Sequence, residues 1–342
     1  MQNVQRCVRT IEYSSGESVD FQALVEAGSP VILKGYVRSW PLIQAGLRSS
    51  DDAMAYLDSY AIEKTLTCYV GDSDMDGRFA YNSDITAFNF RSEQISVSEF
   101  FRRLKIESRE GGDHLYIGST TLERYFPGLR ENNDINFSDP TLQESPPLVS
   151  IWMGNRTIAS AHYDLANNIA CCVAGRRRFT LFPPEQVANL YPGPLEPTPG
   201  GQVVSMVDFK QPDFERFPNF AKALEVAQVA ELEPGDALVY PSMWWHHVEG
   251  LDDFNVLINY WWNPTPAYID TPQNTLLHAM LALRERPDYE KQAWRELFDY
   301  YVFGDPELPR AHLPEHAQGP LGPLDETTAR RLRARLMSKF NR

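Results

Sequence analysis

The sequence predicts a mainly β protein with flanking helices, because the pattern of apolar residues changes twice along the chain. From Val19 to about Glu110, helical patterns alternate with short strand-like runs, which indicates a mixed α/β lead-in. From about Pro147 to Trp262, short apolar runs follow one another at close spacing, as in a barrel or sandwich. After Pro264 the pattern is helical. We therefore expect a lead-in over about residues 1–145, a β core over about 146–265 and a helical region over 266–342.

The lead-in contains three predicted helices and two predicted strands. Apolar residues recur at helical spacing in Phe21–Ala27, Asp51–Tyr60 and Val97–Leu104. Residues 30–34 and 66–70 form short runs with Val, Ile, Leu or Tyr, which are typical of strands.

Six strands are predicted in the β core from runs of four to eight apolar-rich residues. They are Leu148–Met153, Ala159–Tyr163, Ile169–Val173, Phe179–Phe182, Ala237–Tyr240 and Val256–Trp262.

Three helices are predicted after the β core. Thr271 and Pro272 have the residue types of an N-cap and a first turn, and Gly304 ends the second helix. The last helix begins near Asp325, and one apolar stripe on it consists of Ala329, Leu332, Leu336 and Phe340. Such a stripe must be buried against the same domain or against a partner, and we expect a homodimer through these C-terminal helices.

Charge and hydropathy exclude several classes of protein. The 342 residues include 32 Lys and Arg against 46 Asp and Glu, and the net charge of −14 disfavours binding to nucleic acid. The chain has no run of 18 apolar residues and no apolar stretch near its start that would serve as a secretory signal. We therefore expect no membrane partner and a cytoplasmic location.

One short motif has the residue types of a metal site. In His162-Tyr-Asp164 an imidazole and a carboxylate are two positions apart, and on a strand both would face the same side. The strand predicted over 237–240 leads into a further histidine pair 84 residues after His162, and His246 completes a set of two histidines and one carboxylate. This set is the ligand set of Fe(II) oxygenases. Strand alternation places His246 toward the apolar interior and turns His247 away.

A longer pattern of motifs resembles a known family. It consists of Ala161-His-Tyr-Asp164, Leu181-Phe-Pro-Pro-Glu-Gln186, Pro212-Asp-Phe-Glu-Arg-Phe-Pro-Asn219, Pro234-Gly-Asp236, Trp244-Trp-His-His247 and Asn259-Tyr-Trp261. Over about residues 145–265 the sequence resembles the JmjC-like cupin hydroxylases that depend on Fe(II) and 2-oxoglutarate, and most closely the branch typified by the hypoxia-inducible-factor asparaginyl hydroxylase. The resemblance implies a double-stranded β-helix, or jelly roll, for the core.

The resemblance also implies roles for single residues. His162, Asp164 and His246 match the iron ligands, and Tyr116, Asn168 and Asn259 match positions that bind the 2-oxoglutarate cosubstrate. Arg177 stands where that branch has a lysine that holds the far carboxylate of 2-oxoglutarate. A guanidinium can bind a carboxylate through two hydrogen bonds, so this replacement is compatible with the role. Trp261 matches an aromatic position on the substrate side, although a packed barrel tryptophan would leave the same signal. The family threonine falls on Ala159, and Ser160 or Thr157 is available to replace it.

By resemblance, the reaction is the decarboxylation of 2-oxoglutarate by O2 coupled to hydroxylation of an unactivated C–H bond. We expect the substrate to be a protein or peptide side chain, or a small molecule. Two alternatives stay open at this point: a metal-binding cupin without oxygenase activity, in which Arg177 holds another anion, and a catalytically inactive scaffold.

Overall fold

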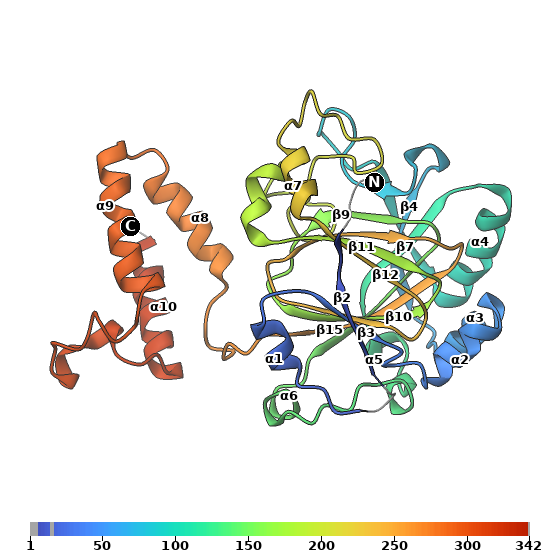
Figure 1. Cartoon of the computed structure of the whole chain (residues 1–342), viewed down its shortest axis with the longest axis horizontal. Coiled ribbons are helices and arrows are strands. Elements are labelled where there is room, and N and C mark those ends of the chain that lie inside the picture. The colour runs from blue at the N-terminus through green and yellow to red at the C-terminus, as the bar shows by residue number, and fades with distance from the viewer. Residues whose placement is uncertain (1–5, 14–16, 341–342) are drawn as a thin grey trace. The chain divides into compact units, whose positions relative to one another are not determined.

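The computed structural model describes residues 6–13 and 17–340, and the chain divides into two compact units after Asn263. Within the described residues, every strand belongs to the first unit (Figure 1). The expected mainly β architecture with flanking helices is confirmed, and its two sheets are consistent with a jelly-roll core. No helix in the described part of the chain is long and apolar enough to cross a lipid bilayer.

Two mixed sheets form the first unit. The six-stranded sheet has the order β1-β12-β11-β14-β9-β5, and the nine-stranded sheet has the order β2-β3-β13-β10-β15-β8-β7-β4-β6. The strands of the first sheet are β1 (Arg6–Cys7), β12 (Gln228–Leu232), β11 (Arg177–Phe182), β14 (Trp245–Gly250), β9 (Ile158–His162) and β5 (Arg78–Phe79). Those of the second are β2 (Arg9–Glu12), β3 (Val31–Lys34), β13 (Ala237–Tyr240), β10 (Asn167–Ala174), β15 (Asn255–Trp262), β8 (Leu148–Gly154), β7 (His114–Thr121), β4 (Thr65–Gly71) and β6 (Phe90–Ser96).

The two sheets enclose an apolar layer. Side chains of both sheets meet in one buried cluster, for example Phe179 and Leu181 of β11 with Leu238 and Tyr240 of β13. Alternate residues of each strand point into this layer, because successive side chains of a strand lie on opposite faces. The same alternation directs the charged Arg177, two residues before Phe179, into the interior.

Helices cover the outer faces. The nine-stranded sheet packs its other face against the N-terminal helices in the largest buried cluster. These helices are α1 (Phe21–Glu26), α2 (Pro41–Arg48), α3 (Ser50–Asp58), α4 (Val97–Glu110), α5 (Leu122–Tyr125) and α6 (Pro140–Glu144). The short helix α7 (Phe220–Val226) and the loop residue Phe209 pack against Phe182 and Trp245 of the six-stranded sheet.

The lead-in strands belong to the same sheets as the core strands. Strands β4, β6 and β7 extend the nine-stranded sheet beyond β8, and four strands between 90 and 250 (β6, β7, β12 and β14) lie outside the runs expected from the sequence. Their side chains mix apolar with polar or charged residues, so they lack a continuous apolar run.

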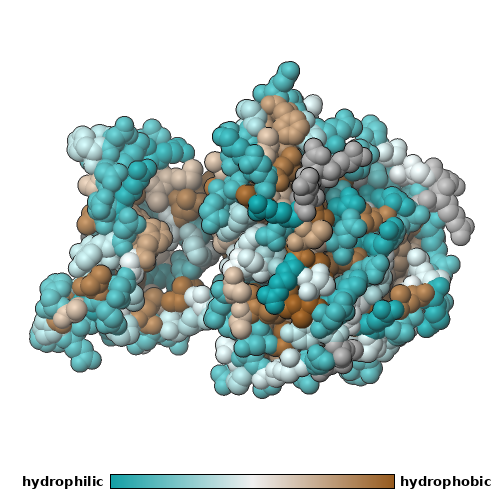
Figure 2. Space-filling view, viewed as in Figure 1, coloured by the Kyte–Doolittle hydropathy of each residue, from teal (hydrophilic) through white to brown (hydrophobic). Residues whose placement is uncertain are grey.

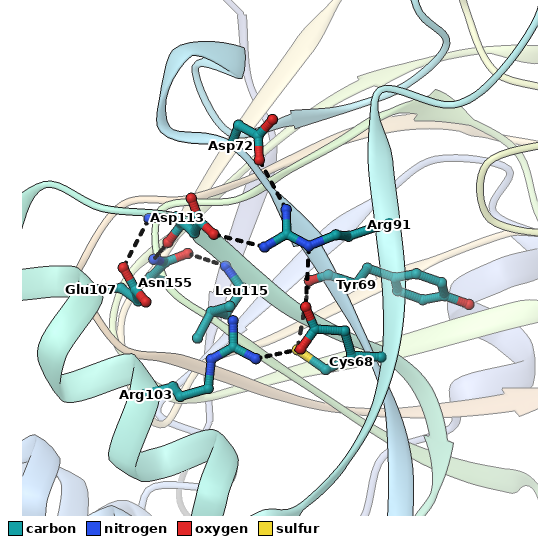
Figure 3. A network of polar contacts seen from close by, with 10 residues as sticks. Cys68, Tyr69, Asp72, Arg91, Arg103, Glu107, Asp113, Leu115 and Asn155 are labelled. Atoms are coloured by element: carbon teal, nitrogen blue, oxygen red, sulfur yellow. Dashed lines mark hydrogen bonds and ion pairs between the residues drawn. The ribbon is translucent and has the colours of Figure 1, made fainter.

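A polar network stabilises this extension of the sheet (Figure 3). Arg91 of β6 forms ion pairs with Asp72 (2.9 Å), Glu93 (3.1 Å) and Asp113 (3.0 Å). Arg103 of α4 pairs with Glu93 at 2.6 Å and lowers the pKa of that carboxyl. The network therefore joins β6 and α4 to the segments that flank β4 and β7.

The second unit consists of helices and turns. Its helices are α8 (Pro272–Leu283), α9 (Asp288–Phe298) and α10 (Glu326–Phe340), coloured orange to red in Figure 1. A π-helical turn continues α9 to Phe303, just before Gly304, where the sequence predicts the helix end. Figure 2 shows apolar side chains exposed on this unit, and of the α10 stripe Ala329 is buried while Leu336 and Phe340 are 42% and 56% exposed.

Candidate metal centre

His162 and His246 face each other across two paired strands. His162 ends β9, His246 lies in β14, and the two residues are opposite partners in the antiparallel ladder, with ring centroids 4.2 Å apart. The next pairing is Val248 with Ala159, so β9 has one residue more than β14 in this interval. Such a bulge changes the alternation of β9, and Ala159 and His162 both line the cleft described below, although they are three positions apart.

Asp164 lies two residues beyond the end of β9 rather than on a strand. Its carbonyl accepts a hydrogen bond (2.8 Å) from the backbone N–H of Met243, a residue with a left-handed φ of 67° in the turn between β13 and β14. One carboxylate oxygen of Asp164 is 3.6 Å from Nε2 of His246. The ligand atoms of His162, Asp164 and His246 all lie within 4.8 Å of one another.

The hydrogen bonds of the two histidines suit them to a metal ion. Nδ1 of His162 is 2.8 Å from the carbonyl of Ser160, and Nδ1 of His246 is 3.0 Å from the carbonyl of Trp244. A carbonyl only accepts, so each Nδ1 carries the proton and each Nε2 keeps its lone pair free. Metal-binding histidines are oriented by such contacts. The residues present therefore fit a divalent metal bound by two imidazoles and one carboxylate.

Burial keeps His246 neutral. Desolvation, followed by the nearby His162, lowers the pKa of His246 to about 4. An uncharged imidazole is the form that coordinates a metal.

His247 lies on the other face of β14. Its ring stacks on Phe209, with centroids 4.4 Å apart, and neither ring nitrogen has a hydrogen-bond partner. Desolvation, followed by the charge of Arg78, lowers its pKa to about 3. The side chain is therefore a neutral part of the outer apolar layer and is not among the three clustered ligands.

A chain of side-chain hydrogen bonds leads from Trp152 to Asp164. The indole N–H of Trp152 donates to Oδ1 of Asn259 (2.7 Å), and Nδ2 of Asn259 donates to Oδ1 of Asn168 (3.4 Å). Nδ2 of Asn168 then donates to Asp164 (3.4 Å), which also accepts from the indole of Trp261 (3.2 Å). An indole only donates, so Trp152 determines which way the amides of Asn259 and Asn168 point. The N–H groups of Asn168 and Trp261 reach the same oxygen, Oδ2 of Asp164.

We expect Trp152→Phe to weaken metal binding, although an indole N–H only donates and is not itself a metal ligand. Without the indole N–H, the amide of Asn259 is free to reverse, and Asn168 loses the contact that directs its N–H toward Asp164. Loss of such an outer contact weakens metal affinity by about tenfold to a hundredfold. Titration calorimetry with Mn(II) measures the effect, and an affinity equal to that of the unchanged protein would contradict this role.

Sequence reasoning missed Trp152 and Tyr240. Tyr240 lies directly opposite Asn168 in the β13/β10 ladder, and its ring centroid is 5.0 Å from that of His246. Trp152 contacts Asn259 diagonally, because its opposite partner on β15 is Leu257. Both tyrosine and tryptophan have the pattern of ordinary core residues, and only the register of the strands identifies their polar partners.

Arg177 is buried and Tyr116 is half-buried inside the first unit, and each influences the pKa of the other. Arg177 is 4% exposed, its Nε has no hydrogen-bond partner, and no carboxylate among residues 6–13 and 17–340 forms an ion pair with it. Desolvation lowers the pKa of its guanidinium and raises that of Tyr116 to about 12, an increase that Arg177 reduces. A buried unpaired cation is costly, so this place fits a bound anion such as a carboxylate.

Ser160 and Thr157, the two candidates to replace the family threonine that falls on Ala159, have surroundings different from those of Ala159. Ala159 faces the interior, the hydroxyl of Ser160 accepts a hydrogen bond from Nε of Arg78 (3.3 Å), and Thr157 lies in the turn before β9.

A cleft of about 580 Å³ opens beside these residues. Its lining includes His162, Ala159, Ser160, Tyr116 and Trp152, and it extends outward over β7, β4 and β6. Part of the loop between Pro192 and Val204 borders it.

A jelly-roll unit that gathers two histidines and one carboxylate at the edge of a cleft defines a class of metal-binding β proteins. The chain belongs to the cupin-like domain family, which matches residues 17–268. The resemblance inferred from the sequence is thereby confirmed.

Several curated proteins are similar to the chain. It is 28% identical to a Jumonji C domain-containing protein 5 from Drosophila melanogaster, over 69% of the chain and 55% of that protein. It is 33% identical to the Lysine-specific demethylase JMJ31 from Arabidopsis thaliana, over 72% and 48%. It is 37% identical to the human HSPB1-associated protein 1, over 57% and 38%. The chain thus spans about half or less of the length of these relatives.

Proposed function

We propose that the chain is an Fe(II)- and 2-oxoglutarate-dependent oxygenase that hydroxylates an unactivated C–H bond, on a protein or peptide side chain. The observation that carries the proposal is the combination of two imidazoles with free Nε2 atoms, the carboxylate of Asp164 and the buried, unpaired guanidinium of Arg177. Relatives named as Jumonji C proteins and as a demethylase support it.

Each residue has a separate task in this proposal. His162, Asp164 and His246 hold the metal, while Asn168 and Trp261 orient the carboxylate of Asp164 through the hydrogen bonds described above. Arg177 and Tyr116 bind the far carboxylate of 2-oxoglutarate, and Asn168 and Asn259 line the same place. When bound, Fe(II) with 2-oxoglutarate and O2 supplies the oxidising chemistry, which yields succinate, CO2 and the hydroxylated product.

Removal of the metal tests this function directly. We expect the purified protein to form succinate from 2-oxoglutarate in air after loading with Fe(II), and to form none under nitrogen or after treatment with a chelator. Addition of Fe(II) in excess of the chelator is expected to restore the activity. Succinate is measured by mass spectrometry.

The matched control is Asp164→Ala, which removes the anionic ligand. If this variant forms as much succinate as the unchanged protein does, the proposal is contradicted. Tight metal binding without O2-dependent succinate would favour a metal-binding cupin of another activity, and absence of both would favour a scaffold.

We also propose a homodimer through the C-terminal helices, because Leu336 and Phe340 leave an apolar stripe exposed in the second unit. A charge at this stripe opposes burial against a partner. We expect Leu336→Arg to yield a folded monomer while the unchanged protein has the mass of a dimer by light scattering at micromolar concentration. Reduced thermal stability without a change of mass would instead indicate that the stripe packs within one chain.

A further inference from the structure

The cleft beside His162 is built on one face of the nine-stranded sheet. Residues of neighbouring strands line it: Thr67 and Tyr69 of β4, Phe90 and Ser92 of β6, Tyr116 and residues 118–121 of β7, and Trp152 of β8. The intervening residues Leu66, Cys68 and Leu115 are buried in the core on the opposite face. Strand alternation therefore gathers aromatic rings along the cleft, from the metal ligands to the edge strand β6.

Gly118 leaves an opening between three of these rings. A Cβ atom at this position would lie 3.5 Å from Tyr69, 3.6 Å from Trp152 and 3.7 Å from Tyr116, which is ordinary van der Waals contact. The pairing of β7 with β8 shifts between Ile117 and Thr120, so Gly118 lies in a bulge. With no side chain at Gly118, the edges of the rings stay open toward the cleft.

The neighbouring rings give the cleft flat walls. Phe88 and Phe90 are stacked with centroids 5.2 Å apart and planes at 6°, and Tyr116 lies 6.2 Å from Trp152 with planes at 30°. Aromatic rings pack favourably against such walls in stacked or edge-to-face geometry.

The charges of the cleft disfavour a cationic substrate. No Asp or Glu is among the described residues that line it, so an ammonium or guanidinium group would find no counter-ion there. Arg124 of α5 lies at the rim, its guanidinium is 5.6 Å from the centroid of the Tyr125 ring, and no described carboxylate forms an ion pair with it. This free positive charge attracts an acidic group.

We propose that the cleft binds an uncharged aromatic side chain of a polypeptide, presented next to an acidic residue that pairs with Arg124. The ring lies against Tyr69, Trp152 and the open edge at Gly118, in the same cleft that His162 lines. The inference rests on the proposed oxygenase function, because it takes the metal ligands as the place of reaction. It predicts a substrate chemistry different from that of the lysine-specific demethylase among the relatives.

A binding selection tests this substrate class without need of turnover. A phage library of random heptapeptides is selected under nitrogen on the chain of 342 residues loaded with Mn(II) and 2-oxoglutarate. We expect enriched peptides to share one aromatic residue with Asp or Glu within three positions. Enrichment of lysine or arginine at the shared position, or no enriched motif, would overturn the inference.

Two positions of the cleft provide the controls. We expect Arg124→Glu to reverse the preference for the flanking residue from acidic to basic while the aromatic residue is retained. Gly118→Leu fills the opening and is expected to lower recovery of the selected peptides by about tenfold or more, and Gly118→Ala by less. Gly118→Ala adds only a methyl group at ordinary contact distance, so it serves if the leucine variant does not fold.

A peptide motif that is unaffected by all three variants would place the binding site elsewhere and overturn the inference. The succinate assay tests the oxygenase function separately, so failure of one is distinguishable from failure of the other.

Discussion

His246→Ala is expected to abolish metal binding. The variant removes one of the three ligands whose atoms lie within 4.8 Å of one another, and the remaining imidazole and carboxylate leave the ion held by two groups. Calorimetry with Mn(II) or Fe(II) under nitrogen is expected to show site binding in the unchanged protein and none at micromolar concentration in the variant. Asp164→Ala and His162→Ala are expected to behave in the same way.

The adjacent histidine supplies a matched control on the same strand. His247→Phe keeps a ring that can stack on Phe209, and it removes two buried nitrogens that have no hydrogen-bond partner. We expect this variant to bind metal as the unchanged protein does. His247→Ala is expected to bind metal too, with lower thermal stability because a cavity replaces the buried ring. Equal loss of metal in His246→Ala and His247→Phe would show that strand alternation identified the wrong ligand.

The strongest part of the sequence-based prediction concerned local patterns. All six predicted core strands are present, the last one as Asn255–Trp262, because each is a short apolar run with its own turn signals. The spacing of His162 and Asp164 suggested a pair on one face of a strand, whereas Asp164 lies beyond the end of β9 and reaches His162 from the following loop. The choice of His246 over His247 followed from alternation, and the structure places those two side chains on opposite faces of β14.

What the sequence could not provide is the register between strands distant in the chain. The bulge that brings Ala159 and His162 to the same cleft depends on how β9 pairs with β14. The diagonal contact of Trp152 with Asn259 likewise depends on the pairing of β8 with β15. A shift of one residue in either ladder would turn these side chains to the other face, and no local pattern specifies that choice. The free charge of Arg124 becomes visible only when the cleft is assembled.

The stability of Arg177 variants distinguishes a ligand-binding role of this residue from a structural role, because the two roles predict opposite changes in stability. Its guanidinium is 4% exposed and lacks an ion pair with any described carboxylate, so it destabilises the fold until an anion binds. Fe(II) held by Asp164 would carry one net positive charge, and Arg177 would add a second. The two negative charges of 2-oxoglutarate balance them, which makes this dianion the expected partner of the site.

We therefore expect Arg177→Ala to weaken 2-oxoglutarate binding while metal affinity is nearly unchanged. Loss of a buried, charge-assisted contact costs about 2 to 5 kcal/mol, which corresponds to about 30-fold to several-thousandfold weaker binding. Calorimetry with 2-oxoglutarate on the Mn(II)-loaded protein under nitrogen measures this loss. Unaltered 2-oxoglutarate affinity in the variant would refute the assignment of Arg177.

Arg177→Met is expected to weaken 2-oxoglutarate binding as well, but to raise the stability of the ligand-free protein. Methionine fills a similar volume without a charge, so the cost of burying the unpaired guanidinium disappears. We expect the free energy of unfolding without metal or 2-oxoglutarate to increase by about 1 to 4 kcal/mol. Addition of 2-oxoglutarate with Mn(II) is then expected to stabilise the unchanged protein much more than the variant, because a ligand stabilises only the state that binds it. A structural role for Arg177 requires the opposite result, in which the methionine variant is the less stable protein and both proteins respond equally to the ligand.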